Sequence, residues 1–296
     1  MTIKSEIIAD SVNMSGNRLT TFLLEYPRYI HSELLTHRVF SKNAASSRAI
    51  PVEKFIQQVI ENPATPSHWG RNQSGMQANE ELLPDEIEQC KREWLSLRDK
   101  AIESVLKLKD IGLHKQVANR LLEPWFHMKI ILSGTEFQNF FALRAHKDAH
   151  PDLQKLAFMM LDQYNNFKPS EKKTGEWHIP FGDKIDQAKL DILEEKIYGP
   201  RQPQTYYFYQ QQELRKKIAV ARCARVSYLN YEGKDDYEVD VQLCDRLFGN
   251  NPKHLSPAEH VAQALDNSEY SGNFRGWKQY RKFFKDENLS DERVVR

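Results

Sequence analysis

The chain has 296 residues, of which 40% are hydrophobic and 28% charged, a composition typical of a soluble globular protein with a sizeable core. Its formal net charge of +1 argues against a protein that coats nucleic acid, although a few local arginines suffice to bind one phosphate. The sequence contains neither an apolar run of about 18 residues nor an apolar N-terminal signal, and its 3 cysteines are too scattered for a disulfide framework. We therefore expect a cytoplasmic protein with neither a membrane nor a nucleic acid as partner.

The first half of the chain predicts one strand followed by several helices. Leu19–Glu25 is short, apolar and β-branched, which indicates a strand, and Pro27 before a periodic apolar pattern indicates the start of a helix. A loop rich in small polar residues then runs to Pro51. The later segments are predicted helices at Val52–Ile60, Leu83–Leu108 and His114–Leu122, a loop at Asn62–Ser74, and a run at Phe126–Leu132 that fits helix or strand.

The second half predicts helices almost throughout. They are expected at Glu136–Arg144, Asp152–Phe167, Ile185–Tyr198, Leu214–Ser227, Val239–Phe248, Pro257–Leu265 and Trp277–Phe284. Glycine and proline are sparse, so no long flexible linker divides the chain. The expected fold class is α+β: a single helix-rich domain over residues 1–296 with a small antiparallel or mixed sheet.

The segment His37–Arg48 concentrates side chains that donate hydrogen bonds. It reads HRVFSKNAASSR, and such a set at a helix end and the following loop suits phosphate oxygens, a pyrimidine edge or a flavin ring. The alternative is a polar helix end with capping serines and solvated arginines. The residues alone leave both interpretations open.

The same segment resembles the signature of the flavin-dependent thymidylate synthases, RHRxxSxNExSxRY. Six residues fall on matching positions: His37, Arg38, Ser41, Asn43, Ser46 and Arg48. The resemblance implies that Ser46 and Arg48 bind the nucleotide substrate, deoxyuridine monophosphate (dUMP). It further implies that FAD is contacted by His37, Arg38, Val39 and Asn43.

Two further blocks are similar to the same family. ANRLLEPW implies that Arg120 binds the substrate phosphate, and EFQNFFALRAHKDAHPDLQKLA implies that Asn139 contacts flavin and that Arg144 binds the uracil. Arg144 would be catalytic, because a cation there stabilises negative charge on the ring. The alternatives are a surface arginine at position 120 and a helix-capping arginine at 144. His146 and His150 have metal-ligand spacing but lack a third dispersed ligand, so no metal is expected.

The family's opening block resembles a segment near the C-terminus instead, which indicates a permuted order. ARCARVSY ends at Tyr228 and HLSPAEH spans His254–His260. The resemblance implies further flavin contacts from Ser227, His254, Ser256 and Glu259. Reconnecting termini that lie close together can preserve a core, so the order is physically reasonable.

The blocks would then divide the domain into the signature at residues 19–51, the second and third blocks at 114–167, the permuted block at 217–265 and an extra tail at 266–296. The tail sequence SGNFRGWKQYRKFF has no counterpart in the family. Its basic and aromatic residues could cover the site or form a charged surface helix, and we expect the surface helix.

The implied reaction is flavin-dependent methylation of dUMP to thymidylate (dTMP), with methylenetetrahydrofolate and NADPH as cosubstrates, in a homotetramer. The sequence departs from the family at six positions, which are Thr36, Ala44, Ala49, Thr135, Asp148 and His150. These departures keep open a related modification such as hydroxymethylation, and a non-catalytic nucleotide-binding module is the alternative from another class. Cys223 alone has cationic neighbours, but its helical phase matches buried positions, so no thiolate nucleophile is expected.

Overall fold

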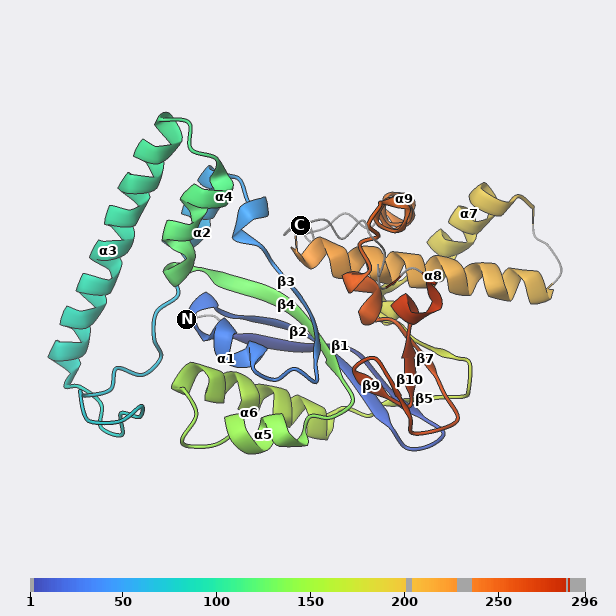
Figure 1. The fold of residues 1–296 in the computed structure, drawn as a ribbon, viewed down its shortest axis with the longest axis horizontal. Helices are drawn as coiled ribbons and strands as arrows, with labels where there is room; N and C mark the ends of the chain where they lie inside the picture. The colour runs from blue at the N-terminus through green and yellow to red at the C-terminus, as the bar shows by residue number, and fades with distance from the viewer. Residues whose placement is uncertain (1–2, 201–203, 228–235, 286, 288–296) are drawn as a thin grey trace.

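The computed structural model describes residues 3–200, 204–227, 236–285 and Glu287. At its centre is a mixed five-stranded sheet in the order β3-β4-β2-β1-β5, in which only β5 joins its neighbour in parallel (Figure 1). The strands are β1 (Lys4–Asn13), β2 (Arg18–Pro27), β3 (Ser41–Ala44), β4 (His127–Gly134) and β5 (Ser170–Lys172).

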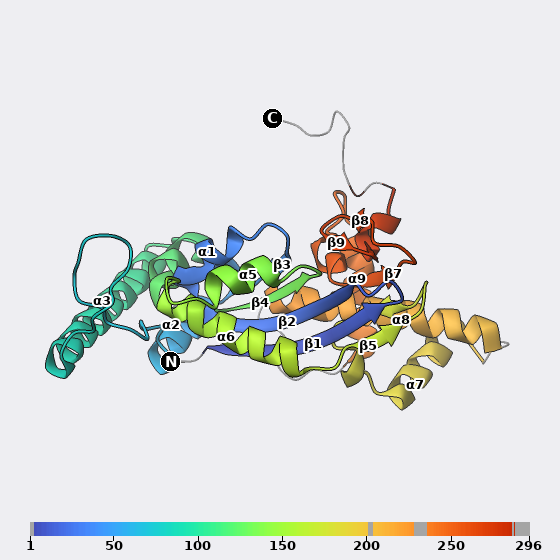
Figure 2. The same cartoon turned by 90° about the horizontal axis from the view of Figure 1, so that it is seen from below.

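Alternating apolar residues give the sheet two buried faces, because neighbouring side chains of a strand point to opposite sides. In β4, Ile130 and Leu132 pack in the large core cluster with α5 (Gln138–Arg144) and α6 (Pro151–Asn166). Ile131 packs on the other face with Cys223 of α8 (Gln204–Ser227). The sheet therefore lies between α5 and α6 on one face and α8 on the other (Figures 1 and 2).

The helices of the first half flank one end of the sheet. The long α3 stands furthest out and is joined to the body through the indole of Trp94, which donates to the carbonyl of Ala64 (Figure 1). These elements are η1 (Arg28–Ile30), α1 (His31–Leu35), η2 (Ser47–Ala49), α2 (Val52–Glu61), α3 (Pro84–Asp110), α4 (Lys115–Ala118) and η3 (Asn119–Trp125).

The C-terminal part packs at the opposite end of the sheet, where α8 lies beside α7 and α9 (Figure 1). A three-stranded sheet, β10-β7-β6, and the pair β8-β9 complete it. The bounds are β6 (Trp177–His178), η4 (Gly182–Lys184), α7 (Gln187–Tyr198), α9 (Tyr237–Gly249), η5 (Ser256–Glu259), β7 (Ala262–Ala264), β8 (Tyr270–Ser271), β9 (Phe274–Arg275), β10 (Trp277–Gln279) and η6 (Tyr280–Phe283).

The structure confirms the expected α+β class and most of the predicted elements. The ambiguous run at Phe126–Leu132 is a strand, β4, because it pairs with both β2 and β3. In the signature segment, the expected loop contains a strand, β3. Within the described residues, no helix is both long and apolar enough to cross a membrane.

Two predicted helices are wrong. Pro257–Leu265 consists of the end of η5 and the strand β7, and Trp277–Phe284 consists of β10 and η6. β7 and β10 pair with each other, and β7 also pairs with β6, which lies more than eighty residues earlier. Pairing with strands that are distant in the sequence makes these short segments extended, although their local pattern fits a helix. The periodicity of one sequence does not reveal such distant partners.

Candidate active site

The turn between α1 and β3 holds the signature histidine against α5. His37 is buried, and its Nε2 accepts a hydrogen bond of 2.9 Å from Nε of Arg144. Burial lowers the pKa of His37, and the nearby charges of Arg144 and Lys42 lower it further. The imidazole is therefore neutral at neutral pH, and because Nε2 accepts, its single ring proton lies on Nδ1.

Arg144 is fixed from one side by three side chains of the α1 region. Besides His37, it donates to Oγ1 of Thr36 at 3.4 Å, and its Nη1 lies 3.7 Å from the carboxylate of Glu33. Its side chain remains 22% exposed. A guanidinium held in this way has little freedom to reorganise and still presents N–H groups to a ligand.

Several predicted site residues have exposed polar side chains without partners. Their side chains make no hydrogen bond or ion pair with any other described residue; they are Arg38, Arg48, Asn139, His254 and Ser256. Val39, next to Arg38, is 45% exposed. Guanidinium groups without a carboxylate partner are available to phosphate oxygens.

A small cavity brings two of the predicted substrate residues together. Ser46 and Arg120 line a cavity of about 140 Å³, and its lining also includes Arg28 and His31. Ser46 also accepts a hydrogen bond of 3.3 Å from the backbone N–H of Arg48 and so begins η2. Arg48 itself is exposed and does not line this cavity.

Glu123 organises the charged wall of this cavity. Its carboxylate accepts hydrogen bonds from Ser47 at 2.6 Å and from Arg120 at 2.7 Å, and it lies 3.9 Å from the guanidinium of Arg28. Burial lowers the pKa of His31 to about 4, so that ring is neutral. Two guanidiniums and one carboxylate leave the wall with a net positive charge, which favours an anion.

Asn43 holds the signature strand to α8. Its amide donates a buried hydrogen bond of 2.7 Å to the backbone carbonyl of Cys223. The amide nitrogen of Asn43, which was predicted to contact flavin, therefore already donates to the backbone of α8. Ser227, another predicted contact, ends α8, and its side chain lies outside the described part of the structure.

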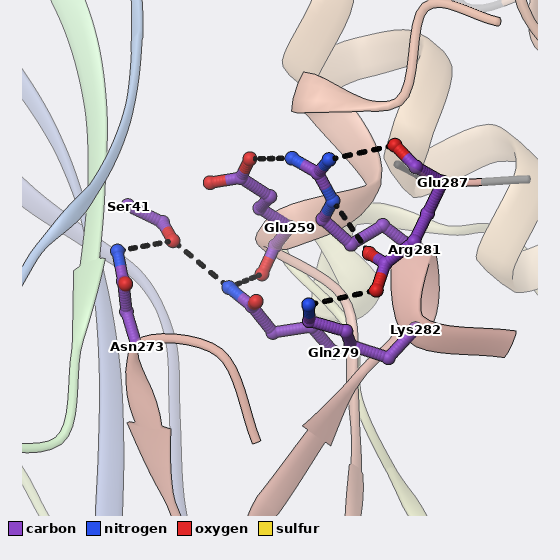
Figure 3. Close-up of polar contacts among 7 residues, drawn as sticks. All are labelled: Ser41, Glu259, Asn273, Gln279, Arg281, Lys282 and Glu287. Carbon is purple, nitrogen blue, oxygen red and sulfur yellow. Dashed lines mark hydrogen bonds and ion pairs between the residues drawn. The ribbon is translucent and has the colours of Figure 1, made fainter. Parts of the chain in front are cut away.

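The HLSPAEH segment lies against the signature strand. Gln279 donates both to Oγ of Ser41 at 2.9 Å and to the backbone carbonyl of Glu259 at 3.3 Å (Figure 3). The carboxylate of Glu259 is paired with Arg281. Segments that resemble the opening and signature blocks of one family, more than two hundred residues apart in this chain, are therefore neighbours in space.

The extra tail does not form the expected surface helix. Trp277 is fully buried in a cluster with Leu19 and Phe274, and its indole donates to the carbonyl of Asn17 at 3.0 Å. The basic and aromatic residues that suggested a charged surface belong instead to β9, β10 and η6, which pack on the sheet and on the HLSPAEH segment. The aromatic positions form the buried side of a small sheet, which has a period of two rather than that of a helix.

A buried chain of hydroxyl and imidazole groups crosses this part of the molecule. Nδ1 of His260 bonds Ser133 at 2.8 Å, Ser133 bonds Thr21 at 2.7 Å, and Thr21 bonds Nε2 of His178 at 2.8 Å. Nδ1 of His178 then bonds Ser11 at 2.9 Å. Burial lowers the pKa of both imidazoles to about 3, so both rings are neutral.

Two of the three cysteines and the two mid-chain histidines are buried or hydrogen-bonded within the fold, whereas Cys90 in α3 is half-buried. Cys223 and Cys244 are fully buried, and burial raises the pKa of both thiols, so neither supplies a thiolate. His146 and His150 each accept a backbone N–H two residues on. Within the described residues, no three metal-ligating side chains are grouped to hold an ion.

A family model described as thymidylate synthase complementing protein matches residues 19–170. The chain belongs to this family. The matched range contains β3, Arg120 and Arg144, and it ends before the HLSPAEH segment. Membership in the thymidylate synthase complementing family confirms the resemblance inferred from the signature.

Two solved structures resemble part of the chain. Both are of a UMP/dUMP methylase, PolB, from Streptomyces cacaoi. The one bound with 5-Br UMP is 17% identical, with a TM-score of 0.45 over 55% of this chain and 89% of that chain. The one bound with 5-Br dUMP is 16% identical, with a TM-score of 0.47 over 55% of this chain and 90% of that chain. A comparison with curated proteins found no match.

Sequence reasoning missed several residues that shape this family member's candidate site. Arg28 and His31 line the cavity beside Ser46, while Gln279 and Asn273 reach Ser41 from the tail. Arg28 had a detectable signal, because an arginine directly after Pro27 at the end of an apolar strand must emerge at the sheet end. Gln279 had none, because its partner lies 238 residues away.

Proposed function

We propose that the chain is an FAD-dependent enzyme that methylates dUMP to dTMP, with methylenetetrahydrofolate as carbon donor and NADPH as reductant. The observation that carries the proposal is the meeting of three stretches that resemble one family. Arg144 contacts His37, and Gln279 joins Ser41 to the backbone of Glu259. Chance matches in sequence would have no reason to be adjacent in space.

The exposed donors fit a flavin dinucleotide. Arg38 offers an unpaired guanidinium for the pyrophosphate, and Asn139, His254 and Ser256 offer hydrogen-bonding groups for the ring system or ribose. Asn43 and Glu259 are engaged within the chain, so we assign them to holding the flavin-binding segments in place. Bound FAD would supply the reducing equivalents, while the protein supplies orientation and electrostatics.

The cavity beside η2 suits the phosphate of dUMP. Arg120 and Arg28 supply guanidinium groups, and Ser46 supplies a hydroxyl. Arg48 is exposed and comes soon after the lining residue Ser46 in the chain, so it would contact the nucleotide from outside the cavity. Because Glu123 already holds Arg120, little conformational entropy is lost when the phosphate binds.

Arg144 would face the uracil and stabilise the negative charge that develops on the ring when carbon 5 becomes nucleophilic. Neutral His37 supports this role, because its Nε2 accepts from Nε of Arg144 and fixes the guanidinium without neutralising it. The thiols of Cys223 and Cys244 are buried, so neither is suited to attack carbon 6, which agrees with a flavin route that needs no cysteine of the enzyme.

The decisive experiment adds FAD and then dUMP to the purified protein and follows the flavin absorbance. We expect a bound, yellow flavoprotein whose spectrum shifts with dUMP, because both ligands would share one site. Protein that binds neither ligand would contradict the proposal. Colourless protein that binds nucleotides or DNA tightly would instead favour a non-catalytic binding module.

The product of turnover distinguishes methylation of dUMP from a second candidate reaction at the same site. Thr36 and Ala44 replace an arginine and a glutamate of the family signature, which favours hydroxymethylation of dUMP as the second candidate. Mass spectrometry after turnover with methylenetetrahydrofolate and NADPH separates the two, because hydroxymethylated deoxyuridylate is one oxygen heavier than dTMP.

Removal of either guanidinium from the cavity should weaken the binding of dUMP. Arg28→Ala and Arg120→Ala each delete a charged hydrogen-bond donor, worth about 1.5–3 kcal/mol, so we expect the Kd to rise roughly 10- to 100-fold. Isothermal titration calorimetry with dUMP and with deoxyuridine, which lacks the phosphate, measures this. The variants should bind deoxyuridine as the parent does, and Arg71→Ala, whose guanidinium pairs with Glu86 at the start of α3, is the control. Equal losses for both ligands would contradict a phosphate subsite.

The domain division, the permuted block order and the assembly are part of the same proposal. We propose one domain over residues 1–296, an intracellular enzyme, and a homotetramer whose subunits share the flavin sites. Light scattering of the purified protein tests the assembly.

A further inference from the structure

We propose that Gln279 and Arg281 are positioning residues, and that the tail segment carrying them sets the geometry of the flavin site. This segment, Asn273–Lys285 together with Glu287, is called the clamp segment below. The inference rests on the proposed function, because it concerns how the HLSPAEH segment is held for FAD. No part of the family model covers the clamp segment.

Gln279 joins two parts of the candidate site directly. It is 2% exposed, and its Nε2 donates to Oγ of Ser41 and to the carbonyl of Glu259 (Figure 3). Asn273 approaches the same hydroxyl, with its Nδ2 at 3.5 Å. Both hydrogens of the Gln279 amide nitrogen are thereby used to fix the distance between β3 and η5. Removal of this amide takes the side-chain donor from the carbonyl of Glu259 and leaves Ser41 with only the longer contact from Asn273.

Gly272 leaves open the space that the amide of Gln279 occupies. Its φ is +65°, and a Cβ built there would lie 2.1 Å from Oε1 of Gln279. The turn before β9 therefore accommodates the Gln279 side chain only because residue 272 has no side chain. Any larger residue there must push the amide away from Ser41 and Glu259.

Arg281 fixes the side chain of the same glutamate. Its guanidinium pairs with the carboxylate of Glu259 and, through Nε at 3.1 Å, with Glu287. Lys282 also pairs with Glu287, at 2.7 Å. Two cations and two carboxylates form a neutral, half-buried cluster in which Glu259 cannot turn freely. Because Gln279 holds the backbone of Glu259 and Arg281 holds its carboxylate, the position of η5 is fixed, and with it that of Ser256 and of His254 just before the helix.

The test compares FAD affinity among variants of the full-length protein. Gln279→Met keeps the length of the side chain but removes its donor, and Arg281→Ala removes the second anchor. We expect each to raise the Kd for FAD about tenfold or more, which corresponds to about 1.4 kcal/mol. Gly272→Ala should reproduce Gln279→Met, and Arg281→Lys should restore part of the loss. Arg275→Ala is the matched control, because the side chain of that arginine of the clamp segment donates, among the described residues, only to the carbonyl of Ser268.

A second measurement separates positioning from general stability and from the proposed function. Hydrogen exchange of the backbone amides of β3 and η5 should accelerate in Gln279→Met, while α3 and α6 keep their protection. Unchanged FAD affinity and unchanged exchange in both variants would overturn the inference. If the parent protein binds no FAD, the proposed function fails, and the exchange rates alone then decide whether the clamp segment positions η5.

Discussion

Replacing Arg144 with alanine should lower kcat/KM for dUMP by roughly 100- to 1000-fold, the usual loss when one preorganised donor to a developing anion is removed. The guanidinium is held by His37, Thr36 and Glu33, and solvent cannot reproduce that arrangement. Steady-state kinetics with methylenetetrahydrofolate and NADPH measure the loss. Arg144→Lys should recover little activity, because a single ammonium cannot keep the contact with His37 and face a ligand in the same geometry.

The pKa of His37 provides a readout of the same substitution that does not depend on turnover. In Arg144→Ala the pKa should rise, because one of the two positive charges that lower it is gone while burial, the largest cause, remains. Titration of the imidazole by NMR reports the shift. Lys147→Ala, which removes an exposed cation just beyond α5, should change neither kcat/KM nor this pKa. An Arg144→Ala variant with full activity would exclude Arg144 from the reaction.

Acid should destabilise the fold steeply through His178 and His260. In the folded chain the pKa of each is about 3, whereas the ordinary value is 6.5. The unfolded chain therefore binds these protons first, so the stabilisation is complete above pH 6.5 and is lost as pH falls toward 3. Each imidazole contributes about 1.4 kcal/mol per pH unit in that window, or about 2 kcal/mol between pH 6.5 and pH 5.

Urea denaturation at a series of pH values tests this prediction. Carboxylates also contribute to acid unfolding, so the comparison that matters is between the parent and His178→Gln. The variant should be less stable at neutral pH, because Thr21 and Ser11 lose part of their hydrogen bonding. Its free energy of unfolding should nevertheless fall less steeply below pH 6.5. Parallel curves for the two proteins would show that His178 is not buried in the neutral form.

The predicted helices of the first half were confirmed where periodicity extends over several turns. α3 repeats its apolar positions over 27 residues, and its start is marked by Pro84 and Glu86, whose carboxylate accepts the N–H of Leu83. Such local signals do not depend on the rest of the chain.

Strands whose partners are remote were the main failures. β1 was also not predicted, although its partner β2 is the next strand along the chain, because its sequence KSEIIADSVN mixes apolar residues with charged and polar ones. β7 and β10 are three residues each, and their apolar residues fit a helical turn equally well. Only pairing across the chain selects the extended form.

The candidate site was foreseen as a set of residues, but its supporting contacts were not. The signature motif identified His37 and Ser46, whereas the arginine beside Ser46, Arg28, belongs to no motif. The contacts of Gln279 depend on the backbone placement of β3, η5 and β10 at once. A sequence motif identifies the types of residue in a site, but it does not specify the distances between them on which the geometry of the site depends.

The hydrogen bond between Ser41 and Gln279 has a consequence for how the protein is made. The two residues are 238 positions apart, so β3 leaves the ribosome well before β10 is synthesised. At about 5–20 residues per second, the delay is roughly 10–50 s. During that interval β1, β2, β3 and β4 can pair, but the HLSPAEH segment and Gln279 have yet to join Ser41. On the proposed function, in which FAD contacts both segments, we expect flavin to be captured after release rather than during translation.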